Sequence, residues 1–400
     1  MTEARTLKTA INHTQIIIGN GQLIEEGSIL FDESGILDIG DKVTFSGDTV
    51  IDGKGKTVLP GFIDSHVHLC FPPYPWTDET RCNQDPVTVG IRVCNQAREL
   101  LKSGITTARV AGTMYGADLQ LRKLVQSGEV KAPRIKASGE VICITAGHCS
   151  ELGIACDTVD QAVTAARSLI AKKVDAIKMM ATGGVIGIGP IGSGQLSPAQ
   201  IAAICAEGKR FGKPTFAHLS LDYECLTAAI KAGITSVEHG NNIDDAAAKL
   251  MVEQGTYYVP TMGVKHNEAH NTLTDPTSIQ LREKAALAQK GSMEAVRIAV
   301  KWGVKMAVGT DNGCPFTNPD TYAYSTEMCL FEQVGMKKMD VIQCATINGA
   351  KLLGIDHITG SLQRGKCADI TVINGDPLED LSATRNVMFT YCAGKLYYKA

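Results

Sequence analysis

Short apolar runs alternate with longer segments of helical periodicity through most of the chain. Residues 198–211 and 222–232 both repeat apolar side chains at helical spacing, and each is followed by a glycine-containing turn and another apolar run. The repeating unit is therefore a buried strand followed by a helix. Over about 250 residues, this pattern predicts an α/β protein with a (β/α)8 TIM barrel, whose functional groups lie at the carboxyl ends of the strands.

The two ends of the chain follow a different pattern. Residues 11–56 and 360–400 contain short alternating strands separated by turn sequences. Neither end is long enough to bury a core of its own, because a small sheet needs a second layer to be stable. We therefore predict that residues 1–57 and 359–400 pair into one small β-sandwich beside a barrel of residues 58–358.

One apolar run, residues 59–69, carries two histidines near its carboxyl end, His66 and His68. Side chains alternate between the faces of a strand, so both rings point the same way. Two imidazoles on one side of a strand end can share a divalent metal ion. The short pattern also fits two polar residues on a half-exposed strand, so the other strands must decide between these interpretations.

Four further polar residues lie in or at the end of later apolar runs: Lys178, His218, His239 and Asp311. An unpaired ammonium group within Ala-Ile-Lys-Met-Met would cost several kcal/mol or lose its proton. A lysine that reaches solvent or pairs with a carboxylate is the alternative for Lys178, and a helix N-cap is the alternative for Asp311. Because several strands carry such residues at the same predicted end, we favour a functional site.

Composition agrees with an ordinary enzyme. The chain has 400 residues, 44% of them hydrophobic, and its 39 Lys and Arg against 42 Asp and Glu give a net charge of −3. Without a basic run, nucleic acid and anionic membranes are not expected partners. No signal sequence and no run of about 18 apolar residues are recognisable, so we predict a cytoplasmic protein. The 13 cysteines include no Cys-x-x-Cys pair and are expected to be reduced.

In this order and spacing, the six candidate ligands resemble those of the metal-dependent amidohydrolase superfamily. Residues 58–68, 309–313, 345–354 and 360–370 extend the resemblance over nearly the whole chain. It is strongest to the branch of Xaa-Pro dipeptidases, Xaa-Arg carboxypeptidases and imidazolonepropionase-related hydrolases.

The resemblance implies a set of ligands for two divalent metal ions. His66, His68 and Asp311 would bind one ion, His218 and His239 the other, and an N-carboxylated Lys178 would bridge both. Zinc is the metal we expect first, although the ligands also suit manganese and cobalt.

A binuclear site of this kind implies hydrolysis of a C–N amide bond. Two ions lower the pKa of a bridging water, and one of them polarises the scissile carbonyl. Asp311 would take the proton of the water and pass it to the leaving nitrogen. We predict a small-molecule or short-peptide substrate, a dipeptide or an N-acyl amino acid with a free carboxylate; the sequence leaves open whether the enzyme forms a homo-oligomer.

Two other classes remain. A mononuclear deaminase or cyclic-amide hydrolase of the imidazolonepropionase type usually lacks the lysine and carries a glutamate three residues after the fifth-strand histidine, but here His218 is followed by Leu-Ser-Leu. A metal-free scaffold would lack ligands, and none is missing. The number of metal ions bound per chain separates the three classes.

Substrate contacts are expected from three more residues. His148 follows a third apolar run and is similar to a family position that contacts the substrate or its transition state, so we assign it a catalytic and binding role. Tyr223 and Arg109 are further candidates, although Tyr223 could equally pack within a helix. Glu238 precedes His239 and should face the helices if the strand alternates regularly. Specificity should depend on the loops at 70–81, 183–195 and 261–271.

Overall fold

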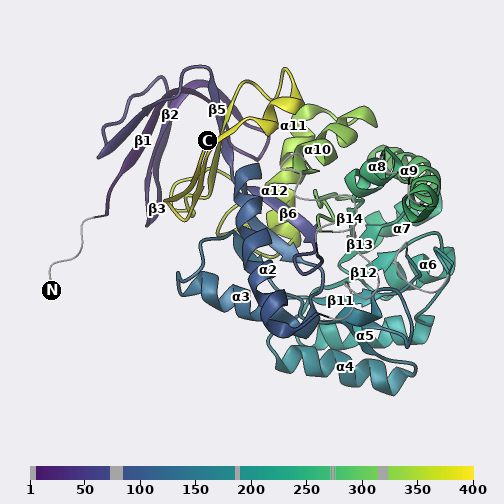
Figure 1. Cartoon of the computed structure of the whole chain (residues 1–400). Helices are drawn as coiled ribbons and strands as arrows, with labels where there is room; N and C mark the ends of the chain where they lie inside the picture. Colours follow the sequence, from purple (N-terminus) through teal and green to yellow (C-terminus); the bar gives the residue numbers. More distant parts are fainter. Residues whose placement is uncertain are drawn as a thin grey trace.

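The first and last strands of the chain join into one sheet of eight strands, which forms a small unit beside a larger α/β body (Figure 1). The computed structural model describes residues 6–72, 84–184, 190–270, 272, 274, 276–313 and 323–400. The strands of the two chain ends meet at β5, which pairs with β1 on one side and with β15 on the other. The strands are β1 (Thr9–Ile17), β2 (Leu23–Asp32), β3 (Gly35–Asp41), β4 (Thr49–Asp52), β5 (Lys56–Pro60), β15 (Ile370–Asn374), β16 (Val387–Cys392) and β17 (Lys395–Lys399).

This sheet folds over on itself around an apolar core. Phe31 on β2 packs edge to face against Tyr391 on β16 at 4.9 Å between ring centroids, although β1, β5 and β15 lie between their strands in the sheet order. Ile16, Val58 and Ile370 are buried in the same cluster. The chain ends thus form one β unit with a core of its own, while the boundaries proposed at residues 57 and 359 stay a prediction.

The larger body contains two parallel sheets, of orders β6-β7-β8 and β10-β9-β11-β12-β13-β14. Their strands are β6 (Phe62–Val67), β7 (Ile105–Val110), β8 (Arg134–Lys136), β9 (Val141–Cys143), β10 (Gly153–Ala155), β11 (Ile177–Met180), β12 (Thr215–Leu219), β13 (Ser236–His239) and β14 (Tyr257–Val259).

The run that ends at Asp311 was expected to be a strand, but it makes only isolated bridges to its neighbours. Met306 pairs with Tyr258 on β14, and Asn312 pairs with Val67 on β6. The amide of Asp311 also donates to the carbonyl of His66 over 2.8 Å. Asp311 has a φ of 55°, a left-handed conformation that interrupts the regular pleat.

Helices surround the parallel strands in Figure 1. They are α2 (Pro86–Leu100), α3 (Ala117–Gln126), α4 (Val159–Ala171), α5 (Pro198–Arg210), α6 (Tyr223–Lys231), α7 (Asp245–Gln254), α8 (Met262–Ala269), α9 (Pro276–Trp302), α10 (Ala323–Gln333), α11 (Lys338–Ala345) and α12 (Ile347–Leu352). The helices predicted at 198–211 and 222–232 are confirmed as α5 and α6. Ser197 begins α5 with a capping box, and Asp222 caps α6. In the described residues, no helix combines the length and apolar character needed to cross a membrane.

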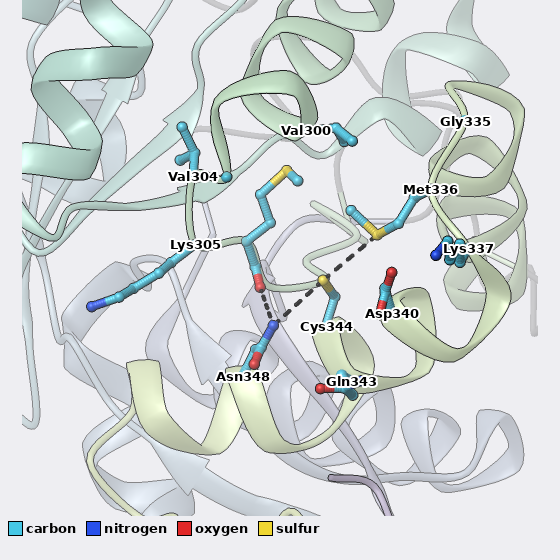
Figure 2. Close-up of a pocket in the computed structure, with 12 residues that line it drawn as sticks. Val300, Val304, Lys305, Gly335, Met336, Lys337, Asp340, Gln343, Cys344 and Asn348 are labelled. Carbon is cyan, nitrogen blue, oxygen red and sulfur yellow. Dashed lines mark hydrogen bonds between the residues drawn. The ribbon is translucent and has the colours of Figure 1, made fainter. Parts of the chain in front are cut away.

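A cavity of about 380 Å³ lies at the end of the body where the 305–312 segment begins (Figure 2). Val304, Met306, Met336, Cys344 and Asn348 contribute to its lining, and the amide of Asn348 donates to the carbonyl of Met306 over 3.1 Å. None of the predicted metal ligands lines it. Asp311 lies at the other end of the same segment, in a separate polar cluster with His66 and His68.

Candidate active site

The predicted histidine ligands form one continuous row of rings. The centroid of His66 lies 5.4 Å from that of His68 and 5.2 Å from that of His239. His239 lies 4.4 Å from His218, and His218 lies 4.3 Å from His148. These residues come from β6, β12, β13 and the loop after β9, so the fold brings together side chains that are far apart in the sequence.

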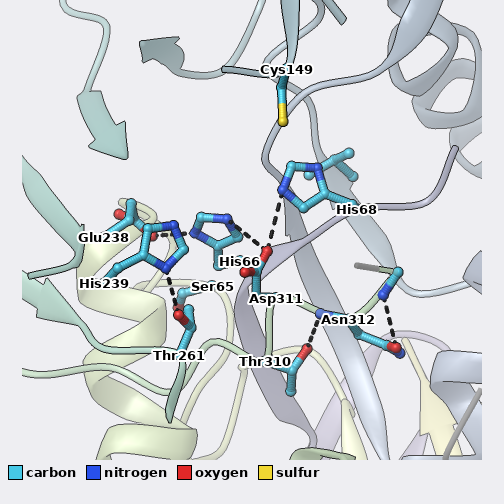
Figure 3. Close-up of polar contacts among 12 residues, drawn as sticks. Ser65, His66, His68, Cys149, Glu238, His239, Thr261, Thr310, Asp311 and Asn312 are labelled. Carbon is cyan, nitrogen blue, oxygen red and sulfur yellow. Dashed lines mark hydrogen bonds and ion pairs between the residues drawn. The ribbon is translucent and has the colours of Figure 1, made fainter. Parts of the chain in front are cut away.

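His66, His68 and Asp311 make up the first half of the site (Figure 3). The Oδ1 atom of Asp311 lies 3.4 Å from His66 Nε2 and 3.3 Å from His68 Nε2. The three side chains are buried and offer ligand atoms within 4.8 Å of one another. Burial alone would raise the pKa of Asp311, but the hydrogen bond from His68 and the nearby positive charges hold it well below its usual range.

Lys178, His218 and His239 make up the second half. Lys178 Nζ and His218 Nε2 are fully buried and form no hydrogen bond with any residue that the structure describes. Burial lowers the pKa of Lys178 to about 8, although Glu238 and Asp311 act in the opposite direction. Burial also lowers the pKa of His218 well below its usual value. Neutral imidazoles and a readily deprotonated lysine suit a cation site, because metal ligands must offer a lone pair.

Glu238 faces the histidine row, so the prediction that it faces the helices is wrong. Its Oε2 atom lies 2.6 Å from His66 Nδ1. Glu238 shares its face of β13 with Ser236, whose hydroxyl donates to the Glu238 carboxylate. His239 follows with a φ of 69°, and this left-handed conformation lets His239 face the same site as its neighbour. Burial alone would raise the pKa of Glu238, but Arg109 and His66 lower it to about 2. The ionised carboxylate orients His66 so that Nε2 points toward Asp311.

Arg109 is buried and held within this network. It is 1% exposed. Its Nη2 donates to Glu238 over 2.8 Å, and its other donors bind the Ser65 carbonyl and the Ser236 hydroxyl. The guanidinium also lies 4.0 Å from the centroid of the Phe216 ring. Every guanidinium nitrogen is bound by the protein, which favours a positioning role for Arg109, and its predicted contact with substrate stays a prediction.

A second positioning contact comes from Thr261, which lies at the N-cap position of α8. Its hydroxyl lies 2.6 Å from His239 Nδ1, which leaves Nε2 of that ring for a ligand (Figure 3). Thr261 has a φ of 48°, an unfavourable conformation for a β-branched residue. Nothing in the sequence distinguishes it from an ordinary loop threonine.

Asp64 connects the first strand to the segment that carries Asp311. Its carboxylate accepts hydrogen bonds from the amide of His66 and from the amide and hydroxyl of Thr310. Burial raises the pKa of Asp64 to about 7. The sequence analysis missed this residue, although its position two residues before His66 predicted the same face of the strand.

His148 lies at the end of the histidine row, in contact with the second half of the site. It is buried, and its amide donates to the side chain of Gln195 over 3.0 Å. A Cβ at position 184 would lie 2.4 Å from the His148 ring, so glycine is required there. This position is compatible with the predicted role near the substrate, which stays a prediction.

Tyr223 lies at the start of α6 with 42% of its surface exposed. Its hydroxyl donates to Asp244, the N-cap of α7, over 3.0 Å. The predicted contact of Tyr223 with substrate also stays a prediction. In the loops expected to set specificity, residues 73–81, 185–189 and 271 lie outside the described residues.

Comparison with known proteins identifies the family. Residues 57–397 match the amidohydrolase family. The chain belongs to the amidohydrolase family. Because its relatives are hydrolases, it is a hydrolytic enzyme.

Individual relatives support the same branches that the sequence resembles. The amidohydrolase is 26% identical to ochratoxinase of Aspergillus niger, over 96% of this chain and 85% of the relative. It is 24% identical to a probable imidazolonepropionase of Xenopus tropicalis, over 94% and 90% of the two chains. A crystal structure of a Xaa-Pro dipeptidase with methionine in its active site matches with a TM-score of 0.87 and 30% identity, over 98% of this chain and 100% of the other.

Proposed function

We propose that this amidohydrolase cleaves the C–N amide bond of a dipeptide or N-acyl amino acid, with two divalent metal ions held by His66, His68, Lys178, His218, His239 and Asp311. The observation that supports this most directly is the buried Lys178 Nζ, which has no hydrogen-bond partner. A lysine kept in that position for structure would leave a costly buried amine. A role as a metal ligand would explain why this amine is kept buried beside the histidines.

Lys178 would act as a carbamate. Its neutral amine adds to the carbon of CO₂, the N–C bond forms, and the amine proton is released to solvent. This converts the side chain into an anion that offers two oxygens. The lowered pKa of Lys178, to about 8, favours the neutral amine that this addition requires.

When bound, the two ions would supply a water of lowered pKa and polarise the scissile carbonyl. Zinc is the first expectation for their identity. The protein contributes the proton transfer, since Asp311 Oδ1 lies between His66 and His68 and is kept ionised. Asp311 would accept the proton of the nucleophile and deliver it to the leaving nitrogen. His148 would contact the carbonyl oxygen from the side of His218.

We also infer that the 305–312 segment is the eighth strand of a closed (β/α)8 barrel. Its bridges to β14 on one side and to β6 on the other support this inference. The strand is irregular because Asp311 adopts a left-handed conformation in order to face the histidines. A small-molecule or short-peptide substrate and a cytoplasmic location complete the proposal.

Metal analysis of the purified enzyme, combined with a screen of dipeptides and N-acyl amino acids, tests this function. Two ions per chain and hydrolysis of at least one compound are expected. One ion per chain with activity confined to cyclic amides or amino-substituted heterocycles would favour the mononuclear class, to which the probable imidazolonepropionase relative points. A chain that binds no metal would be a scaffold.

A further inference from the structure

A third buried basic side chain, Lys265, lies on α8 close to the histidine row. In the described part of the chain, the buried lysines and arginines are Arg109, Lys178 and Lys265. Arg109 is bound to Glu238, and Lys178 belongs to the proposed metal ligands. Lys265 is only 7% exposed, and among the described residues it forms no hydrogen bond and no ion pair. Within the described ranges, its charge therefore has no ion-pair partner of the kind that a buried ammonium group needs.

The geometry of α8 directs this side chain toward the site. Thr261, Lys265 and Glu268 are spaced by four and three residues, so they share one face of the helix. All three are buried, and Thr261 at the start of that face contacts His239. His270, which lies off this face, is exposed.

The electrostatic influence of Lys265 agrees with this placement. Its charge contributes to lowering the pKa of His218, His239 and Asp311, which come from both halves of the site. Lys265 also acts on Glu268, but the two do not form an ion pair. This influence agrees with the place of Lys265 on the face of α8 that contacts His239.

The start of α8 is fixed, so Lys265 is presented from a defined position. The carboxylate of Glu327 on α10 accepts hydrogen bonds from the amides of Met262 and Gly263. These donors are among the first amides of the helix, which have no partner within it. Because this backbone is held before a ligand arrives, less conformational freedom of the helix is lost on binding.

We propose that Lys265 binds the free carboxylate of the leaving amino acid and so restricts the enzyme to substrates with an anionic end. This proposal rests on the proposed amide hydrolysis. Two of the three residues predicted to contact the substrate are bound within the protein, since Arg109 binds Glu238 and Tyr223 donates to Asp244. A carboxylate provides the charge that Lys265 lacks, and a charge-assisted hydrogen bond between them is worth more than a neutral one.

The test compares Lys265→Met with the wild type on a matched pair of substrates: the dipeptide cleaved fastest in the screen, and the same dipeptide with its C-terminus amidated. For the free acid, kcat/KM should fall by about 10- to 100-fold in Lys265→Met. For the amide it should change by less than about threefold, because no charge is lost from that complex. Lys290→Met, an exposed change on α9, is the matched control and should leave both values unchanged.

Binding provides a second measurement that does not require turnover. Calorimetric titration of the metal-loaded protein with L-methionine and L-methioninamide should show a preference for the acid in the wild type and in Lys290→Met, and none in Lys265→Met. The metal content of all three proteins should be equal. Equal losses on both substrates, an unchanged preference in Lys265→Met, or no preference in the wild type would overturn the carboxylate role.

These outcomes separate the two proposals. If the wild type binds two ions and cleaves no amide but prefers methionine through Lys265, the proposed hydrolysis fails and the anion site stands. If it cleaves dipeptides and amidated dipeptides equally, hydrolysis stands and the role of Lys265 fails.

Discussion

The two halves of the candidate metal site differ in the source of their negative charge. His66 and His68 share a carboxylate, Asp311, and His66 is oriented by a second one, Glu238. The second half contains Lys178, His218 and His239, and its orienting contact is the neutral hydroxyl of Thr261. The first half is thus supplied with anions by the chain itself. The second obtains one only if Lys178 is carboxylated.

This difference explains why Lys178 lies where it does. A cation pair needs anionic ligands on both sides, because neutral imidazoles do not offset the charge of two divalent ions. The described residues around His218 and His239 contribute a further positive charge, Lys265. We therefore expect the second half to depend on Lys178 and the first half on its built-in carboxylates.

The largest effect is expected from Lys178→Ala. The variant should lose most of its metal and nearly all of its activity, because the second half then has no anionic ligand. A short carboxylic acid such as propionate should restore part of the activity by occupying the same space. Metal content by mass spectrometry and initial rates measure both effects, with Lys290→Ala as a control. Full activity in Lys178→Ala would exclude the binuclear proposal.

Asp311→Asn tests the carboxylate of the first half. As a proton shuttle, Asp311 should matter more to turnover than to affinity, so kcat should fall by about 10²-fold or more. A substantial part of the metal should remain, since His66 and His68 are still present. Steady-state kinetics and metal analysis on the same sample distinguish these contributions. An unchanged kcat with a raised KM would remove Asp311 from proton transfer.

The two orienting contacts allow a direct comparison of the halves. Glu238→Gln should weaken metal binding by about 10- to 100-fold, because His66 loses its ionised partner and Arg109 is left with a neutral one. Thr261→Val should have a smaller effect, since only a neutral hydrogen bond to His239 is lost. Chelator competition measures both affinities, and Thr261→Ser retains the hydroxyl as a control. Equal losses in the two variants would contradict the proposed asymmetry.

The smallest effect concerns the support of α8 by Glu327. Burial raises the pKa of Glu327 from 4.5 to about 8. The folded protein therefore holds a proton that the unfolded chain releases between these values. Protonated Glu327 therefore adds to the free energy of unfolding. This contribution is complete below pH 4.5 and is lost as the pH rises to about 8. Glu327→Gln does not titrate, so its Tm should fall less than that of the wild type over this range. A Tm difference that is independent of pH would contradict this assignment.

The sequence alone was sufficient to predict which residues gather at the site. Apolar runs ending in His68, His218 and His239 predicted strands with functional ends, and the helices α5 and α6 were predicted almost to the residue. Both predictions succeed because periodicity reports which side chains share a face, and that relation is local.

Only the tertiary structure decided how those residues are supported. The left-handed backbone at His239 lets His239 and its neighbour Glu238 both face the site, and regular alternation cannot predict this. Glu238 in turn binds Arg109, which the sequence analysis had assigned to the substrate. Lys265 lies on a helix whose sequence is that of an ordinary surface segment, and it is buried because Thr261 and Glu327 fix the start of α8 against the site. These contacts join residues that are far apart in the chain, so packing alone determines them.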